Sequence, residues 1–438
     1  MKLETQNKMK PETNSAQIFS LALGLNEPWF IEEVRLANIT DSPVKELHIH
    51  INFRKGHEFI FEDGQKGKGY DTEDKVWRHL DFFQHKCYLH ARVPRIERSD
   101  GKVRQAPVPW ARSGSGFTLL FEAYTMLLIE NEMPVNKVAG CVKVTVPRVW
   151  RVFDCWMVSE HSDALSLSKC RTIDRARRRD DLSAVCQIGI DETSSKKGHS
   201  YVTAFVDMEQ HRVIDVQPGK DKEAVKDFVD RLELKGGNRK QIEQVCIDMS
   251  PAFIAGTYEM FQNGQITFDK FHIIQHLNNA MNEVRKRERA GNELIKNHKY
   301  TFLRLNKNLS DNKRNELAHI TMMYPHLGEA YRLKEMFIDV FGIEDADQAK
   351  GYLQFWCDMA IESGIQPFIK FVNLIKAHWF GIVNYFDSKL TNGILESINS
   401  KIQLAKKRAR GFRNIKNYMN MIMYICGKLK FDYPLISL

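Results

Sequence analysis

The chain has 438 residues, 43% of them hydrophobic and 27% charged, and its 64 Lys and Arg against 55 Asp and Glu give a formal charge of +9. This composition excludes a mostly disordered protein, because it supplies enough apolar surface for a substantial core. At roughly 150 residues per domain, the length predicts two to four domains. The positive charge is modest, so its distribution is more informative than its total.

Three features of the sequence bear on the compartment. The longest apolar stretches, such as Thr118 to Ile129, fall short of the roughly 20 residues that cross a bilayer. The segment Met1 to Ala16 is polar and of mixed charge, unlike a secretion signal. The eight cysteines are scattered without a C-x-x-C pair, which is typical of reduced thiols. We therefore expect a cytoplasmic protein with no membrane contact, no disulfide framework and no obvious zinc site.

The first predicted domain, after a lead-in over residues 1–30, is a β-rich module over residues 31–112. Apolar residues alternate between positions 47 and 53 with the period of a half-buried strand, and Cys87–Val93 predicts another strand. Residues 63–70 are rich in glycine and charge, which predicts a turn.

Residues 117–180 are predicted to hold a helix-turn-helix region and a basic linker. Two short helices, over Val135–Cys141 and Pro147–Met157, give its outline, although an ordinary helical hairpin is the alternative for so short a pattern. The helix before them, from Phe117 on, has an apolar stripe of Leu120, Tyr124, Leu127 and Leu128. The side chains that would face DNA are Lys143, Arg148 and Arg151.

A run of arginines follows these helices. It is a solvated linker by default, and a phosphate-binding arm if DNA lies beneath it. The predicted DNA contacts in this run are Arg175, Arg177, Arg178 and Arg179.

From residue 184 the sequence predicts an α/β catalytic domain. Strand-like runs over 185–190, 201–206 and 212–216 precede a helix, a strand, a second helix and a last strand that ends at Phe268. This is the order of an RNase H-like domain. Helical periodicity then prevails to about residue 380, so the predicted parts are a core over 184–280, a helical insertion over 281–385 and the rest of the core over 386–438. The fold class is a multidomain α+β protein.

Carboxylates at the ends of these strands predict a metal site. Strands that end in Asp are common, so Asp191, Asp248 or Asp269 alone is more often structural. In this strand order, however, the first and fourth strands are parallel neighbours, so Asp191 and Asp248 reach one edge, where their charges repel unless a cation lies between them. Glu396, on a helix with an apolar face toward the sheet, is the candidate third ligand, with an exposed helix residue as the alternative.

Oxygen ligands favour Mg²⁺ or Mn²⁺ over zinc, and a pair of such ions would activate a water or hydroxyl for attack on phosphate. His272 either touches that phosphate or caps a helix. Trp356 and Trp379 stack on an unpaired base or, more often, belong to a core. A cationic stripe beyond Glu396 is a solvated face or a path for the DNA backbone. The stripe comprises Lys401, Lys406, Lys407, Arg408, Arg410, Arg413 and Lys416.

These features together resemble the insertion-sequence transposases of the DDE superfamily, in the ISL-three family. The resemblance runs from about residue 30 to residue 425. The motifs that carry it are VWRHLDF (Val76–Phe82), YLHARVPRI (Tyr88–Ile96), VPWARSGSGFT (Val108–Thr118), GIDETSSKKGHSY (Gly189–Tyr201), CIDMSPAF (Cys246–Phe253), FDKFH (Phe268–His272) and NGILESINSKIQLAKKRARGF (Asn392–Phe412).

The resemblance implies that Asp191, Asp248 and Glu396 are the catalytic, metal-binding acids, and that Asp269 and His272 belong to a motif near them. It also implies that residues 117–160 grip the ends of the element. Many relatives carry cysteine or cysteine and histidine pairs in the N-terminal module as a zinc ribbon. The corresponding stretches here, 59–70 and 94–101, contain no cysteine, so we expect a degenerate ribbon held by hydrophobic packing.

The sequence therefore predicts a transposase that binds the terminal inverted repeats of its element, cleaves DNA with divalent metal ions and joins the ends to target DNA. The expected partners are this double-stranded DNA and further copies of the chain, because two ends must be joined. A prokaryotic protein associated with the nucleoid is expected. Two alternatives remain at this stage, a catalytically inactive DNA-binding protein derived from a transposase and a structure-specific RNase H-like nuclease.

Overall fold

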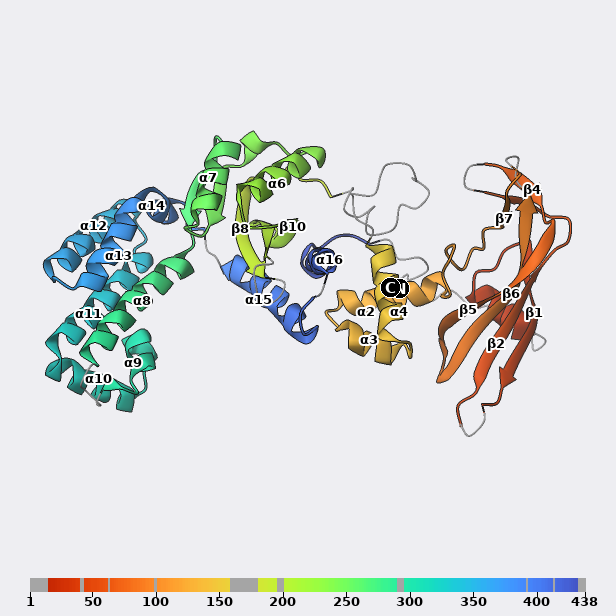
Figure 1. Ribbon diagram of the computed structural model, residues 1–438, viewed down its shortest axis with the longest axis horizontal. Helices are drawn as coiled ribbons and strands as arrows, with labels where there is room; N and C mark the ends of the chain where they lie inside the picture. The colour runs from red at the N-terminus through yellow and green to blue at the C-terminus, as the bar shows by residue number, and fades with distance from the viewer. Residues whose placement is uncertain are drawn as a thin grey trace, which may run out of the picture. The chain divides into compact units, whose positions relative to one another are not determined.

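A computed structural model describes residues 15–39, 43–61, 64–97, 101–157, 180–194, 201–289, 295–390, 393–412 and 414–431 (Figure 1). The chain forms two compact units, Met1–Arg177 with Lys430–Leu438, and Arg178–Leu429. Across the described ranges, we find no helix that combines the length and the apolar character needed to cross a membrane.

The first unit begins with a short helix and a five-stranded sheet. In this sheet β2 and β6 are parallel, and the other pairs are antiparallel. The elements are α1 (Ser15–Ala22), β1 (Trp29–Ala37), β2 (Glu46–Phe53), β5 (Asp71–Phe82), β6 (His85–Glu97) and β7 (Val103–Gln105), in the order β1-β2-β6-β5 with β7 also paired to β6. Two further strands, β3 (Glu58–Ile60) and β4 (Lys66–Lys68), form a separate ribbon.

The alternation predicted for β2 is confirmed, because Leu47, Ile49 and Ile51 are buried. Their core is aromatic at its centre, where the ring of Trp110 lies 5.0 Å from that of Trp29 and 5.7 Å from that of Trp77. The predicted turn over residues 63–70 is wrong in part, since it contains β4. The sequence analysis also missed β1 and β5, because charged residues interrupt the apolar residues of both strands.

The predicted pair of short helices is confirmed as α3 (Val135–Cys141) and α4 (Val146–Trp156), which follow α2 (Leu119–Glu130). Thr145 is the N-cap residue of α4, and Pro147 lies in the first turn, where a missing N–H costs nothing.

The apolar stripe predicted for α2 is wrong. Tyr124 is exposed, while Phe121, Met126 and Ile129 are buried beside the carboxylate of Glu122. This acid can be buried because it has three donors. They are Nε of Arg112 at 2.8 Å, Oγ of Ser115 at 2.6 Å and Nε1 of Trp156 at 2.9 Å.

The second unit is built on a mixed sheet in the order β10-β9-β8-β11-β12. β9 is antiparallel to both of its neighbours, whereas β11 is parallel to β8 and β12. The prediction that the first and fourth strands are parallel neighbours is therefore confirmed. The strands are β8 (Gln187–Ser194), β9 (Tyr201–Asp207), β10 (Arg212–Pro218), β11 (Gln244–Ile247) and β12 (Gln265–Phe268).

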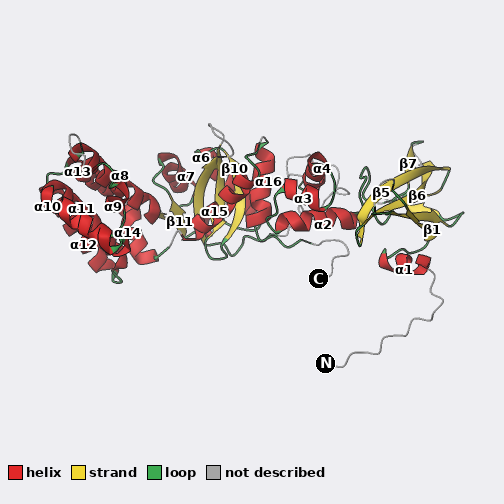
Figure 2. Ribbon diagram, turned by 90° about the horizontal axis from the view of Figure 1, so that it is seen from below, coloured by secondary structure: helices red, strands yellow, loops and turns green. Residues whose placement is uncertain are grey.

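Helices cover both faces of this sheet (Figures 1 and 2). On one face, Phe205 of β9 stacks on Phe228 of α6 (Lys222–Leu234), with ring centroids 4.1 Å apart, and α7 (Pro251–Met260) packs beside α6. On the other face lie α15 (Gly393–Arg408) and α16 (Ile415–Cys426), where Tyr418 is 3.3 Å from Thr193 of β8. Alternate residues of β8 therefore point to α6 and to α15.

The predicted helical segment is confirmed between β12 and α15. Its helices are α8 (Lys270–Glu288), α9 (Lys299–Leu303), α10 (Asp311–Met323), α11 (Pro325–Asp339), α12 (Ala346–Glu362), α13 (Gln366–Ala377) and α14 (Trp379–Ser388). Short 3-10 helices, η2 (Arg239–Gln241), η4 (Asn306–Asn308) and η5 (Val340–Gly342), complete the unit. Trp356 is fully buried and donates its N–H to the carbonyl of Leu333 at 2.8 Å, so it is a core residue.

The last helix of this segment closes an open edge of the sheet. Asn384 of α14 donates to the carbonyl oxygen of Ile266 at 3.1 Å and to the hydroxyl of Thr267 at 3.0 Å, both in β12. An edge strand carries backbone groups that need partners, and α14 supplies one here.

Candidate active site and DNA-binding region

Three aspartates lie at one level of three neighbouring strands. The parallel register pairs Cys246 with Gly189, so two residues later Asp248 comes beside Asp191. The register of β11 with β12 likewise brings Asp269 level with Asp248. Because adjacent strands are about 4.8 Å apart, the backbone positions of Asp191 and Asp248 are neighbours, and so are those of Asp248 and Asp269.

The position of Asp191 within its strand differs from the prediction. The strand does not end at this residue but continues to Ser194, since β8 stays paired with β9 beyond the end of β11. Residues of β8 in strand conformation therefore precede and follow Asp191, and its side chain points to the face that α15 covers.

The carboxylate of Asp191 is half-buried and accepts one hydrogen bond on each oxygen. Its Oδ1 accepts from the backbone N–H of Glu192 at 2.7 Å, and its Oδ2 accepts from Nδ2 of Asn399 in α15. Burial raises the pKa of Asp191 to about 6, and the charge of Asp269 adds to this, whereas the two hydrogen bonds and His272 act in the opposite direction. The site therefore favours a neutral acid or an added cation.

The other two aspartates also organise the helices that follow them. Oδ1 of Asp248 accepts from the backbone N–H of Ser250 at 2.9 Å, at the start of α7. Oδ1 of Asp269 accepts from the backbone N–H of Phe271 at 2.6 Å and caps α8, while its Oδ2 lies 3.7 Å from Nε2 of His272. A role of Asp248 and Asp269 in starting these helices is therefore compatible with a role near a metal site.

Glu396 lies exposed in the first turn of α15, the helix that packs along β8. The approach of this helix is close at Gly189, where a Cβ atom would come within 2.7 Å of Cδ2 of Leu395. Only glycine lets the helix lie so near the strand. Asn399 lies one turn further along α15 and donates to Asp191, so Glu396 lies one helical turn before the residue of α15 that contacts this acid.

Further hydrogen bonds fix the position of α15 along β8. Nε2 of Gln403 donates to the hydroxyl of Thr193 at 2.7 Å, and Nζ of Lys406 donates to the carbonyl oxygen of Ser194 and to its hydroxyl at 2.9 Å. With Asn399 these residues form one face of the helix. The sequence analysis missed Asn399, although its spacing three residues after Glu396 is a signal that could have found it.

The donor chemistry of this edge suits a hard divalent cation. It offers carboxylate oxygens, and burial, which raises the pKa of Asp191, disfavours its negative charge unless a cation is added. The side chains are not closed into a shell, since within the described ranges no three His, Cys, Asp or Glu residues are arranged to hold an ion. The structure thus sets the backbone positions of Asp191 and Asp248 side by side on neighbouring strands and places Glu396 on the adjoining helix.

The side chains predicted to contact DNA from the helix-turn-helix differ in their contacts within the protein. Nζ of Lys143 donates to Oδ2 of Asp81 at 2.6 Å, and the guanidinium of Arg148 lies 4.2 Å from the ring centroid of Phe117. Arg151 is exposed on the outer face of α4.

The cationic stripe of α15 is divided in the same way. Lys406 is used at the end of β8, while Lys407 and Arg410 are exposed. The predicted contacts Arg175, Arg177, Arg178, Arg179 and Arg413 lie outside the described residues.

Comparison with known proteins agrees with this architecture. A family model for the transposase of the DDE type in family ISL3 matches residues 188–422, and the helix-turn-helix domain of transposase family ISL3 matches residues 106–156. The fold and its acid-bearing edge, with these matches, define a DDE transposase that carries a DNA-binding helix-turn-helix. The chain belongs to the ISL3 family of insertion-sequence transposases.

Two curated transposases show the extent of this similarity. The chain is 27% identical over 382 residues, 80% of its length and 82% of the other, to the transposase for insertion sequence element IS1557 of Mycobacterium tuberculosis. It is 26% identical over 257 residues, 56% of its length and 63% of the other, to the transposase for IS1001 of Bordetella parapertussis. Family membership implies a DNA-cleaving enzyme of the DDE type.

Proposed function

We propose that this transposase binds the terminal inverted repeats of its own insertion sequence and catalyses metal-dependent cleavage and strand transfer on an RNase H-like core. Asp191, Asp248 and Glu396 are the proposed catalytic acids and metal ligands, with Asp269 and His272 in support. The observation that carries the proposal is the alignment of Asp191 with Asp248 on parallel strands while α15 is bonded to Asp191 through Asn399.

Mg²⁺ or Mn²⁺ ions, when bound by these acids, would stabilise the charge that develops on the attacking and leaving oxygens of the phosphate. The protein's own part is to hold the acids. β8 and β11 fix two carboxylates from the backbone, and Asn399 holds Oδ2 of Asp191 in one orientation. The half-buried setting of Asp191 limits water around its carboxylate, which strengthens any charge interaction there.

Recognition of the ends is assigned to α3 and α4. The N-terminal residues of a recognition helix approach base edges in the major groove, and this end of α4 carries the exposed Arg148 and Arg151. Two ends must be cut and joined in one reaction, so we also propose that copies of the chain assemble on DNA.

The test uses a duplex that carries the terminal sequence flanking the reading frame, with Mg²⁺ and the full chain. We expect nicking at the element boundary by the wild type. Asp248→Asn and Glu396→Gln should each remove cleavage while the dissociation constant for the duplex stays within about threefold, because these side chains hold metal rather than DNA.

Two results would contradict the proposal. Cleavage at the wild-type rate by either variant would show that the acids are assigned wrongly. Preference for branched DNA of any sequence over the element ends would favour a structure-specific nuclease instead.

A further inference from the structure

The turn of the β5–β6 hairpin has an unusual residue at its tip. Phe82 pairs with His85, so Phe83 and Gln84 form a two-residue turn, and Phe83 has a φ of +51°. In this left-handed region the Cβ atom of an L residue crowds the following carbonyl oxygen. Tight hairpin turns normally place glycine, asparagine or aspartate at positive φ, so a bulky aromatic side chain here is an outlier.

Packing within the first unit does not explain this aromatic residue. The ring of Phe82 lies 5.3 Å from that of Phe19 in α1, which anchors it to the unit. The ring of Phe83 meets Phe82 edge-on at 4.6 Å and remains 84% exposed. An outlier of backbone conformation that the surrounding core does not require points to a role outside the fold.

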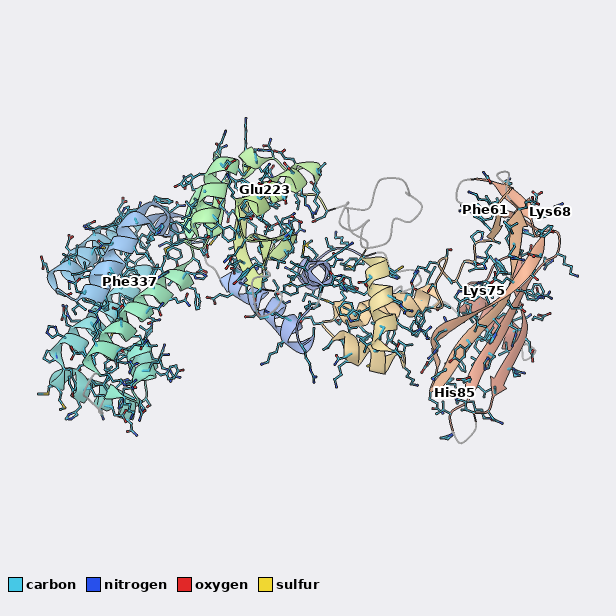
Figure 3. All side chains as sticks on the ribbon, in the orientation of Figure 1. Phe61, Lys68, Lys75, His85, Glu223 and Phe337 are labelled. Atoms are coloured by element: carbon cyan, nitrogen blue, oxygen red, sulfur yellow. The ribbon has the colours of Figure 1, made fainter. Side chains whose placement is uncertain are left out.

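The hairpin is tied to the turn of the helix-turn-helix. Nζ of Lys143 donates to Oδ2 of Asp81 at 2.6 Å and to the carbonyl oxygen of Gln84 at 3.5 Å. Lys143 stands two residues before Thr145, the N-cap of α4. Figure 3 labels His85, at the start of β6, on this end of the sheet.

Backbone hydrogen bonds strengthen the same connection. The N–H of Arg78 in β5 donates to the carbonyl oxygen of Gly116 at 2.9 Å, and the N–H of Thr118, the N-cap of α2, donates to the carbonyl oxygen of Arg78 at 3.1 Å. The hairpin and the helices thus form one body, and the exposed ring of Phe83 has a fixed place near the N-terminal end of α4.

We propose that Phe83 is a DNA contact, an apolar wedge that packs against sugars and bases of the duplex beside the base pairs approached by α4 and partly unstacks one step. The proposal rests on the proposed binding of element ends by the helix-turn-helix. Its physical basis is that Phe83 adjoins the surface of the helix-turn-helix that is proposed to bind DNA. Lys and Arg side chains there suit phosphates, whereas an exposed aromatic ring suits a base face or a kinked step.

The experiment separates a DNA role from a structural role by substituting the strained residue. Phe83→Gly relieves the positive φ, so it should raise the melting temperature of the free protein, yet it should weaken binding to the end duplex roughly tenfold, the scale of one aromatic contact with a base. Phe83→Ala should weaken binding as much, and Phe83→Trp should bind within about threefold of wild type. A 2-aminopurine base placed across the flanking steps should brighten with the wild type and not with Phe83→Gly.

Tyr70→Ala is the matched control. Tyr70 is an aromatic residue that is 74% exposed at the other end of β5, and its loss should leave the dissociation constant unchanged. Wild-type affinity of Phe83→Gly and Phe83→Ala for the end duplex would overturn this inference but not the proposed function. The same result is expected if Phe83 contacts a protein partner and not DNA. Failure of the wild type itself to prefer end DNA would overturn the proposed function and this inference together.

Discussion

Two acids in different units of the molecule, the buried Glu122 and the half-buried Asp191, have opposite surroundings. Glu122 in α2 is completely buried, and it has a cation, a hydroxyl and an indole N–H as partners. Asp191 in β8 has a backbone N–H and a carboxamide as partners, and its neighbours Asp248 and Asp269 are also acids.

The difference shows how a folded protein separates structural from chemical carboxylates. A buried charge with its own counter-charge holds the surrounding elements together, and breaking the pair is costly. Burial raises the pKa of a carboxylate that lacks a paired counter-charge, as it does for Asp191, and such a carboxylate is ready to take a proton or a metal ion. The first kind belongs to stability, and the second kind points to function.

The largest expected effect is on catalysis at Asp191. Asp191→Asn keeps the size of the side chain and an oxygen that can accept from Asn399, but removes the negative charge that a metal ion needs. We expect the rate of end cleavage to fall at least about a thousandfold, with folding intact. Single-turnover cleavage assays and circular dichroism measure the two properties. Measurable cleavage within tenfold of wild type would contradict the contrast between the two acids.

The opposite acid should control stability rather than chemistry. Glu122→Gln removes the buried charge that pairs with the half-buried Arg112, so we expect the free energy of unfolding to fall by about 2 to 4 kcal/mol. Urea denaturation followed by tryptophan fluorescence measures this change. Glu58→Gln, at an exposed position in β3, is the control and should change stability by less than about 0.5 kcal/mol. A loss equal to that of the control would mean that the pair is not important.

The arrangement of the second unit could be predicted from sequence to a large extent. Apolar runs of strand length, separated by helices of clear period, determined the strand order, and the aspartates that follow β11 and β12 were found by position. The extension of β8 past Asp191 was not found, because it depends on pairing with β9 and not on local apolar content.

Contacts between distant residues account for most of what was missed. The sequence did not indicate that Glu122 is buried, since its partner Arg112 lies outside the helix and Trp156 lies 34 positions away. Lys143 and Lys406 looked like free cations, yet their partners lie 62 and 212 positions away. A single sequence shows the charge of a side chain but not the group that meets it.

The role of Asn399 sharpens the comparison at the active-site end. Asn399→Ala leaves Oδ2 of Asp191 without its donor and loosens the helix that carries Glu396, so we expect cleavage at low Mg²⁺ to fall 10- to 100-fold, as is typical for residues that orient metal ligands. Excess Mg²⁺ should recover part of this loss. The readout is the Mg²⁺ concentration that gives half-maximal cleavage.

Gln403→Ala is the matched variant for this test. It removes another carboxamide that bonds α15 to β8, but its partner is the hydroxyl of Thr193 and not an acid. A merely structural role for Asn399 predicts the same Mg²⁺ dependence in both variants. A positioning role predicts a higher requirement only in Asn399→Ala.

The smallest expected effect is a pH-dependent gain of stability in Asp191→Asn without metal. The pKa of Asp191 is about 6 in the folded chain against 3.8 for the free group, so between these values the folded state holds a proton that the unfolded state has lost. The penalty for folding with this charge therefore grows as the pH rises through that window and is complete above about pH 6. Asparagine has no such penalty.

In buffer with a chelator, Asp191→Asn should be more stable than wild type by on the order of 2 kcal/mol at pH 7.5, and the difference should vanish near pH 4. Denaturation curves of both proteins at these pH values measure it, and a variant less stable than wild type at pH 7.5 would place Asp191 with Glu122 among the structural acids.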